Sequence, residues 1–245
     1  MDEVLRVGTA GWSIPRAVDD RFPDGASILA RYAQALPAVE INSSFYRPHR
    51  RATYERWAAT TPEAFAFAVK APKSVTHERR LRDADALLAR FLDEIGGLGA
   101  KLGAVLIQLP PSLPFDETAE TFLRDWRDRH AGPTVCEPRH PSWFTPAADA
   151  ALGDAWIARV AADPAVVPQA AEPGGWRGLT YLRLHGSPRM YASAYGPDAL
   201  AAAARRLDQR PTGTVGWCIF DNTMLGAATE NALALATCAG PPRRA

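Results

Sequence analysis

The side chains best suited to chemistry gather where apolar runs of this sequence end. Only three lysines, three asparagines and five histidines occur among 245 residues, and almost all of the 28 basic residues are arginines. Lys70, Asn42, Asn222 and His185 nonetheless each stand at the end of an apolar, strand-like run. Because the active sites of parallel α/β proteins lie at the carboxyl ends of the strands, this placement predicts a site at one end of a parallel sheet.

Two glutamates in such positions could serve as a general acid and a general base. Glu40 and Glu137 each close an apolar run, and carboxylates are also metal ligands. The two-residue period of a strand places Glu40 on one face with Asn42, and Glu137 on one face with Arg139. The alternative is that each glutamate neutralises an arginine, for which Arg183 is a candidate.

Three histidines could join these glutamates in a metal site. They follow or end strand-like runs, but no HExxH or similar spacing occurs, so residue types alone support a divalent metal. The cofactor therefore stays unassigned, and the candidate ligands are Glu40, His77, Glu137, His140 and His185.

Lys70 ends the run 66–70, Ala-Phe-Ala-Val-Lys, in which its neighbours on the same face of a strand are alanines. Small neighbours leave room for a ligand beside the ammonium. The amine could hold a phosphate, or form a Schiff base if burial lowers its pKa. The alternative is an ion pair with Glu40 across neighbouring strands.

The last two expected strands are followed by loops of the kind that bind phosphate in barrels. Glycine in such a loop lets backbone N–H groups approach an anion. Aromatic side chains nearby could stack on sugar rings or bases, or could pin their loops to the rim, the favoured interpretation for Phe45. The residues expected to bind ligand are Trp12, Asn42, Tyr46, Gln108, Arg139, His140, Arg183, Gly186, Asp221 and Asn222. The residues expected to take part in catalysis are Glu40, Lys70, His77, Glu137 and His185.

Elements of two kinds must position these residues, because strand and helix patterns alternate along the chain. Strands are predicted at residues 4–8, 38–41, 65–70, 102–109, 134–137, 156–161, 180–185 and 214–220. Eight strands that alternate with helices predict a single (β/α)8 TIM barrel, and a doubly wound open sheet is the alternative. The sixth strand is the weakest of the eight. Residues 163–178 show no obvious order and could form a lid.

One domain over residues 1–240 is expected, with a frayed tail at 241–245. The formal charge of +1 gives no overall field toward nucleic acid or membrane. Three widely spaced cysteines without a CxxC pair predict a reduced, cytoplasmic protein. No signal peptide or membrane-spanning run is expected. The expected partner is a small-molecule or nucleic-acid ligand that carries phosphate, and the sequence does not indicate an oligomeric state.

Seven short motifs together resemble one known family, the YecE-like family or domain of unknown function 72. In sequence order they are GTAGW at 8–12, EINSSFY at 40–46, FAVKAP at 67–72, QLP at 108–110, EPRHPSW at 137–143, YLRLHG at 181–186, and FDN at 220–222 followed by NA at 231–232. The resemblance implies a TIM barrel but supplies no reaction.

The resemblance also implies likeness to the barrels of apurinic endonucleases and xylose isomerases, which hold metals with His, Glu and Asp at strand ends. Their ligand set does not map position by position onto this sequence. Asp221 stands where the family often has a second asparagine, which puts in doubt a role that needs a neutral amide there.

Three functions follow as hypotheses. The first is an enzyme that acts on an anionic polar ligand, a phosphorylated sugar or a nucleic-acid segment, by metal-assisted hydrolysis or isomerisation. The second is a metal-free enzyme that forms a Schiff base on Lys70. The third is a non-catalytic module that binds nucleic acid or protein.

Overall fold

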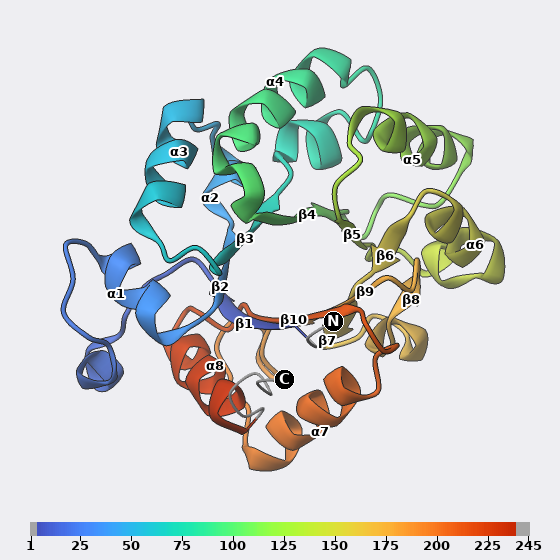
Figure 1. The fold of residues 1–245 in the computed structure, drawn as a ribbon. Helices are drawn as coiled ribbons and strands as arrows, with labels where there is room; N and C mark the ends of the chain where they lie inside the picture. Colours follow the sequence, from blue (N-terminus) through green and yellow to red (C-terminus); the bar gives the residue numbers. More distant parts are fainter. Residues whose placement is uncertain (1–3, 239–245) are drawn as a thin grey trace.

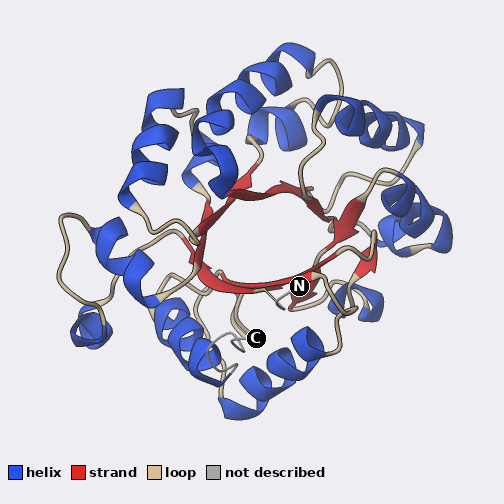
Figure 2. Cartoon of the chain, in the orientation of Figure 1, coloured by secondary structure: helices blue, strands red, loops and turns tan. Residues whose placement is uncertain are grey.

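A ten-stranded sheet curves round until it is nearly barrel-shaped, and the helices lie outside it (Figures 1 and 2). The structure is a computed structural model that describes residues 4–238. The strands are β1 (Leu5–Ala10), β2 (Ala38–Ile41), β3 (Ala66–Lys70), β4 (Leu102–Gln108), β5 (Thr134–Glu137), β6 (Ile157–Arg159), β7 (Ala161–Asp163), β8 (Gly174–Gly175), β9 (Leu179–Leu184) and β10 (Val215–Phe220). The α-helices are α1 (Ile28–Ala35), α2 (Ser43–Tyr46), α3 (Arg51–Thr60), α4 (Asp85–Ile95), α5 (Glu117–Arg129), α6 (Pro146–Asp154), α7 (Pro197–Asp208) and α8 (Ala227–Cys238).

The strand order is β7-β9-β10-β1-β2-β3-β4-β5-β6-β8, and every neighbouring pair except β6 with β8 is parallel. The eight predicted strands are therefore present with shifted ends, but the predicted sixth strand is divided. Its first piece, β6, pairs with β5, and its second piece, β7, pairs with β9. Val160 lies between the pieces and still donates its N–H to the Cys136 carbonyl at 2.9 Å. The segment 157–163 thus pairs with β5, at one end of the row of parallel strands, and with β9, at the other end.

The expectation that residues 163–178 lack order was wrong. This stretch contains the short helix Pro168–Ala171 and strand β8, which pairs antiparallel with β6 and makes the sheet mixed. Asp149 on α6 explains the order, because its Oδ1 accepts both the Gly175 N–H at 2.8 Å and the Arg159 Nε–H at 3.2 Å. Arg159 also donates to the Gln169 carbonyl at 2.9 Å.

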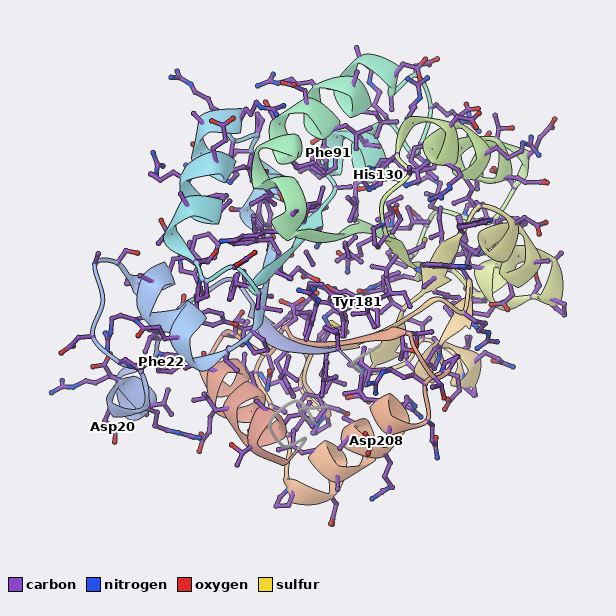
Figure 3. The ribbon with its side chains drawn as sticks, viewed as in Figure 1. Asp20, Phe22, Phe91, His130, Tyr181 and Asp208 are labelled. Carbon is purple, nitrogen blue, oxygen red and sulfur yellow. The ribbon has the colours of Figure 1, made fainter. Side chains whose placement is uncertain are left out.

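Side chains inside the curved sheet differ in size from one side to the other. Strands β2 to β4 contribute small residues, Ala38, Ala66, Ala68 and Ala104. Strands β9 and β10 contribute Tyr181 and Trp217, whose rings stack with centroids 5.6 Å apart. Figure 3 shows Tyr181 within the ring of strands. Small residues thus lie opposite large ones inside the sheet, which fills the interior.

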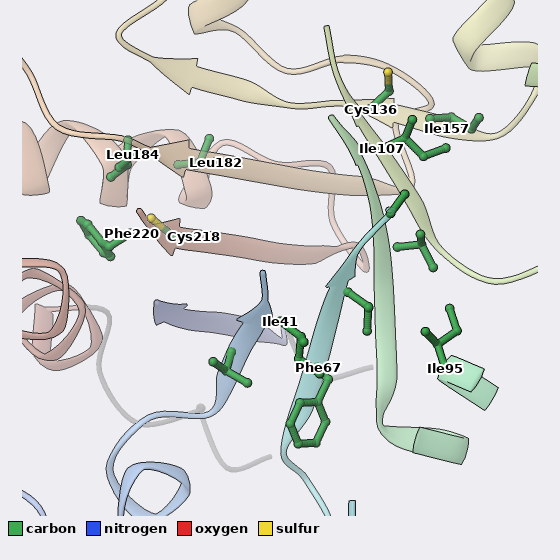
Figure 4. Packing of buried hydrophobic residues seen from close by; sticks show 14 of the residues in the cluster. Ile41, Phe67, Ile95, Ile107, Cys136, Ile157, Leu182, Leu184, Cys218 and Phe220 are labelled. Carbon is green, nitrogen blue, oxygen red and sulfur yellow. The ribbon is translucent and has the colours of Figure 1, made fainter. Parts of the chain in front are cut away.

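The alternate side chains of the same strands pack outward against the helices. Phe67, Ile107, Leu182 and Phe220 belong to this larger apolar cluster, and Figure 4 shows these residues on their strands. The pattern follows the two-residue period of a strand, because odd and even positions face opposite sides of the sheet. The same period carries Glu40, Lys70, Glu137 and Arg183 onto the inner face.

Two of the cysteines, Cys136 and Cys218, are free and buried. No helix within residues 4–238 is long and apolar enough to cross a membrane. The predicted frayed tail, 241–245, lies outside the described residues.

Candidate functional site

One guanidinium joins three carboxylates at the carboxyl ends of the strands. Arg183 is fully buried. It donates to Glu40 twice, from Nη2 to Oε1 at 2.6 Å and from Nε to Oε2 at 3.1 Å. It also donates to Glu137 Oε2 at 2.6 Å and to Asp221 Oδ2 at 3.0 Å. The predicted neutralisation of the glutamates by Arg183 is confirmed, because an arginine presents enough N–H donors for several carboxylates at once.

His185 lies between two of these carboxylates. Its Nδ1 is 3.0 Å from Asp221 Oδ2, and its Nε2 is 3.1 Å from Glu137 Oε1. Burial by itself lowers the pKa of His185, but the Glu137 charge and the bonds to both carboxylates outweigh burial, and the pKa is raised. The arrangement therefore favours the imidazolium, which can donate from both nitrogens.

The pKa values of the two carboxyl groups that bond to His185 shift in the opposite direction. Burial raises the pKa of Glu137, but Arg183 and then His185 outweigh it and hold this pKa well below its usual range. Burial also raises the pKa of Asp221, and the same two partners lower it overall. Both carboxyl groups are consequently ionised throughout the neutral range.

Every oxygen of the two glutamates already accepts a hydrogen bond. Tyr181 donates its hydroxyl to Glu40 Oε2 at 2.9 Å, beside the Arg183 bonds. Glu137 Oε1 also accepts from Gln108 Nε2 at 3.2 Å and from Arg139 Nε and Nη2 at 3.0 and 2.7 Å. The structure thus gives every oxygen of both glutamates a donor, while their roles as acid and base stay predictions.

The residues present do not fit the predicted metal site. Within residues 4–238, no group of three or more His, Cys, Asp or Glu side chains could hold a metal ion. A cation at the glutamates would meet the Arg183 guanidinium, which already occupies the space between their oxygens. The candidate histidines also lie apart. His140 begins the short helix Pro141–Phe144, where its Nδ1 accepts the Ser142 N–H at 3.2 Å.

Lys70 ends β3 with a very different environment. Its side chain is only 8 % exposed, and its Nζ lies 4.2 Å from the centroid of the Phe45 ring. No carboxylate oxygen of the described residues lies within 4.0 Å of this nitrogen, so the ion pair with Glu40 offered as the alternative is not formed. The reason is that both oxygens of Glu40 face Arg183.

Burial lowers the pKa of Lys70 to about 8, and the charge of Arg183 acts in the same direction. Glu40, Glu137 and Asp221 raise it again, but less. A stack on a ring face stabilises an ammonium by roughly 0.5–2 kcal/mol, which does not replace a carboxylate in a buried place. Lys70 is therefore a buried amine that is charged only in part near pH 8.

His77 and Arg139 face the same space as Lys70. The edge of the His77 ring meets the Phe45 ring at 5.0 Å, from a single π turn, Ser74–Glu78. Burial, then Lys70 and Arg139, lower the pKa of His77. Arg139 uses Nε and Nη2 for Glu137, while Nη1 meets only the Met190 sulfur, at 3.9 Å. His77 thus lies within the electrostatic reach of both Lys70 and Arg139, while Arg139 stays bound to Glu137.

The predicted aromatic ligand-binding residues lie in two kinds of place. Trp12 packs edge-on against Trp57 at 5.1 Å and is partly buried, so it pins its loop. Tyr46 is 72 % exposed, with its ring edge-on to Phe45 at 5.0 Å. Only Tyr46 offers a free ring face near Lys70.

The two predicted asparagines and Gly186 mainly hold loops together. Asn222 donates from Nδ2 to the Ser193 carbonyl at 2.9 Å and to Asn231 Oδ1 at 3.0 Å. The Gly186 N–H donates to the Tyr195 hydroxyl at 2.7 Å, so it already has an acceptor. Asn42 points its Nδ2 at Asp221 Oδ1, 3.5 Å away, and its Oδ1 is buried with no partner among the described residues.

Sequence reasoning missed three contributors to the site. Phe45 supports the Lys70 ammonium instead of only pinning its loop. Tyr181 bonds to Glu40, and the shared face with Arg183 was a signal for it. Asn231 connects α8 to the loop after β9, and its signal was the NA motif at 231–232 that accompanies FDN.

A nearly barrel-shaped, mainly parallel sheet with charged residues at the carboxyl ends of its strands defines the class: an α/β protein with a polar site built from strand ends. Within that class the chain belongs to a family of unknown function, because the model of the family described as "Protein of unknown function DUF72" matches residues 6–245. The resemblance seen in the sequence is confirmed.

Two curated relatives carry related names. The chain is 31% identical over 142 residues to the UPF0759 protein YecE of Escherichia coli (strain K12), which covers 58% of this chain and 50% of the relative. It is 28% identical over 151 residues to the UPF0759 protein YunF of Bacillus subtilis (strain 168), which covers 58% of this chain and 53% of the relative. The match thus spans about half the length of these relatives.

Two solved structures share the fold. A DUF72 family protein from Enterococcus faecalis V583 superposes with a TM-score of 0.80 at 20% identity, over 98% of this chain and 97% of that one. A DUF72 family protein from Thermotoga maritima MSB8 gives a TM-score of 0.78 at 23% identity, over 96% and 99%. At these identities the likeness establishes the fold alone.

Proposed function

We propose that this chain is an enzyme that binds an anionic, polar ligand at the carboxyl ends of its strands. Lys70, Arg139 and His77 face the ligand, and the carboxylates bound to Arg183 form a fixed base beneath it. We further propose that the sheet is a (β/α)8 barrel in plan, closed through the divided strand β6–β7.

The sorting of charge carries this proposal. Arg139, Arg183 and His185 each lie within bonding distance of a carboxylate. Lys70 differs, because no carboxylate of the described residues reaches its nitrogen. A buried charge without a partner costs several kcal/mol, and an anionic ligand beside Lys70 would offset that cost.

A small ligand fits these observations better than a long polyanion. The chain's net charge of +1 supplies no extended basic surface. Arg139 Nη1 and Lys70 Nζ can hold one phosphate or carboxylate group, and the exposed Tyr46 ring can stack on a sugar. A phosphorylated sugar is therefore the favoured ligand class.

Calorimetric titration with inorganic phosphate and ribose 5-phosphate tests the proposal. We expect binding to weaken at least about tenfold in Lys70→Met and in Arg139→Met, since each removes one charged contact. Lys73→Met is the matched control, because Lys73 is exposed and paired with Glu78 at 3.1 Å. Equal affinity in all four proteins, or no binding by the unmodified chain, would refute the anion site.

Turnover separates an enzyme from a binding module. His77 is the accessible proton-transfer group, since its Nδ1 bonds to Thr76 Oγ1 at 2.9 Å and its Nε2 has no partner among the described residues. With a panel of sugar phosphates followed by phosphorus NMR, we expect conversion by the unmodified chain and its loss in His77→Gln. Binding without any conversion across the panel would favour the non-catalytic module.

A further inference from the structure

The three lysines of this chain stand in three different environments. Lys101 donates from Nζ to the carbonyls of Ala58 and Thr61, both at 2.6 Å. Lys73 is about half exposed and paired with Glu78. Lys70 alone has no oxygen partner among residues 4–238, although it is buried at the end of a central strand. The Lys101 amine donates hydrogen bonds, and the Lys73 amine is ion-paired at the surface. Lys70 differs from both.

The surroundings of Lys70 leave its buried nitrogen without an oxygen partner among residues 4–238. Ala66 and Ala68, which precede it on the inner face, have no polar side-chain atoms to offer it. The Phe45 ring supports one side of the nitrogen without accepting a conventional hydrogen bond. The nearby carboxylates are held by Arg183, Arg139 and His185, so none of them binds the ammonium. A lone pair on this nitrogen would therefore have no competing hydrogen-bond donor among residues 4–238.

The charge of this amine favours reaction near neutral pH. With a pKa of about 8, roughly a tenth of Lys70 is the free amine at pH 7, compared with well under a thousandth for an ordinary lysine. The groups that face it are Arg183, Glu40, Glu137 and Asp221 from the strands, with His77 and Arg139 from the following loops. Desolvated lysines of this kind are nucleophiles toward carbonyl carbon.

We infer that Lys70 forms an imine with an anionic aldehyde or ketone, whose anionic group lies against Arg139. This inference rests on the anion site proposed above and names the carbonyl as its reacting group. It follows from a buried amine without an oxygen partner, an arginine whose Nη1 meets only a thioether sulfur, and a histidine whose Nε2 has no partner among the described residues.

The chemical step balances without a cofactor. The Lys70 nitrogen bonds to the carbonyl carbon, the C=O pair moves to oxygen, and that oxygen takes a proton. The C–OH bond then breaks, the hydroxyl leaves as water with a second proton, and the nitrogen lone pair completes the C=N bond. One amine and one carbonyl give one imine and one water, with no change of oxidation state. His77 Nε2 accepts the proton that nitrogen loses and returns it to the departing hydroxyl.

Reductive trapping on the whole chain tests the inference. Pyruvate, dihydroxyacetone phosphate and neutral acetaldehyde would each be incubated with the protein and sodium borohydride, and the labelled peptides identified by mass spectrometry. We expect at least about tenfold more label on Lys70 than on Lys73 or Lys101 of the same molecule. The two anionic probes should label Lys70 faster than acetaldehyde does. Label on Lys70 should also rise around pH 8, whereas label on Lys73 should rise only at higher pH.

The three lysines serve as internal controls, so the result does not depend on a variant that folds. Lys70→Met should lose the main label, and Lys73→Met should keep it. Equal labelling of the three lysines, or no label on Lys70 from any probe, would overturn the imine even where calorimetry shows phosphate binding. Strong labelling by acetaldehyde alone, with no phosphate binding, would instead remove the anion site and with it the anionic carbonyl.

Discussion

The two sides of the site treat buried charge in opposite ways. On one side, the Arg183 cluster consists of Glu40, Glu137, Arg183, His185 and Asp221, and each charged atom has a partner from another strand. On the other side, a lysine and a histidine share only the Phe45 ring between them. Buried ions need partners, and the first side supplies them within the chain, whereas Lys70 on the second side has no carboxylate partner among residues 4–238.

This difference separates stability from function. Groups whose interactions are satisfied internally raise the free energy of unfolding, whereas groups left unsatisfied lower it and are available to a ligand. Substitutions on the two sides should therefore change stability with opposite signs. The four predictions that follow test this contrast.

Removal of Arg183 should have the largest effect. Arg183→Met leaves three carboxylates buried near one another without their shared partner, which should lower the free energy of unfolding by about 3–5 kcal/mol at pH 7. Because small domains are stable by only about 5–15 kcal/mol, the variant should unfold at a much lower urea concentration or fail to accumulate in folded form. Urea denaturation followed by circular dichroism measures the change.

The control for this prediction is an arginine whose ion pair is exposed. Arg124→Met breaks the pair with Glu120 on the surface of α5, with an expected loss below about 0.5 kcal/mol. Arg183→Lys keeps the charge, but a lysine cannot reach three carboxylates. Its loss in free energy of unfolding should therefore lie between those of Arg183→Met and Arg124→Met. A loss at Arg183 no greater than at Arg124 would mean that the cluster contributes no stability.

Removal of Lys70 should have the opposite sign. Its pKa is lowered to about 8 from the ordinary 10.5, so the folded state binds fewer protons than the unfolded state between these values, and stability rises with pH there. Below pH 8 the ammonium destabilises the fold, and Lys70→Met should be more stable than the unmodified chain by ~1–3 kcal/mol at pH 7. The advantage should shrink when urea denaturation is repeated at pH 9.5. A destabilised Lys70→Met at pH 7 would show that the amine has an internal partner.

The separation of the two sides could be predicted from the sequence only in part. The ends of the strands and the inner face of Glu40, Glu137 and Arg183 follow from the two-residue period, which the backbone geometry imposes. The choice of partners does not follow from it. Arg183 and Glu40 stand 143 positions apart, and their pairing depends on register and side-chain conformation in the assembled sheet. The sequence therefore left Glu40 with either Arg183 or Lys70 as partner.

The division of the sixth strand could not be predicted from the sequence, for a similar reason. Residues 157–163 read Ile-Ala-Arg-Val-Ala-Ala-Asp, and no glycine or proline marks the break at Val160. The break arises because the run must pair with β5 at its start and with β9 at its end. The curvature of the whole sheet determines where the strand divides, and this curvature cannot be predicted from the local sequence pattern.

Substitution of His185 should depend on pH. Its pKa is raised, so the stability from its bonds to Glu137 and Asp221 is fully present below the ordinary value of 6.5 and is lost as pH rises through the raised value. Both carboxylates have lowered pKa values and stay ionised at pH 5.5. His185→Gln should therefore lose ~1–2 kcal/mol more at pH 5.5 than at pH 8.5, measured by urea denaturation.

His130 provides the control with the reverse sign. Burial and then Arg127 lower the pKa of His130, so its imidazolium destabilises the fold at low pH. Relative to the unmodified chain, the free energy of unfolding of His130→Gln should accordingly be higher at pH 5.5 than at pH 8.5. If His185→Gln lost the same stability at both values, the charge of His185 would not change between pH 5.5 and pH 8.5.

The smallest effect is expected at Phe45, whose ring lies against both Lys70 and His77. Phe45→Leu keeps an apolar residue but removes the ring face below the ammonium, a contact worth about 0.5–1 kcal/mol in a place that is partly open. The pKa of Lys70 should then fall further, by less than about one unit, and the pH at which borohydride trapping on Lys70 reaches half its maximum should move down with it. Tyr46→Leu removes the neighbouring ring, which touches Phe45 and carries no ammonium, and should leave that pH unchanged. An upward shift in Phe45→Leu would mean that the ring acts mainly by excluding water from the amine, and the Lys70 side would then resemble an ordinary apolar pocket.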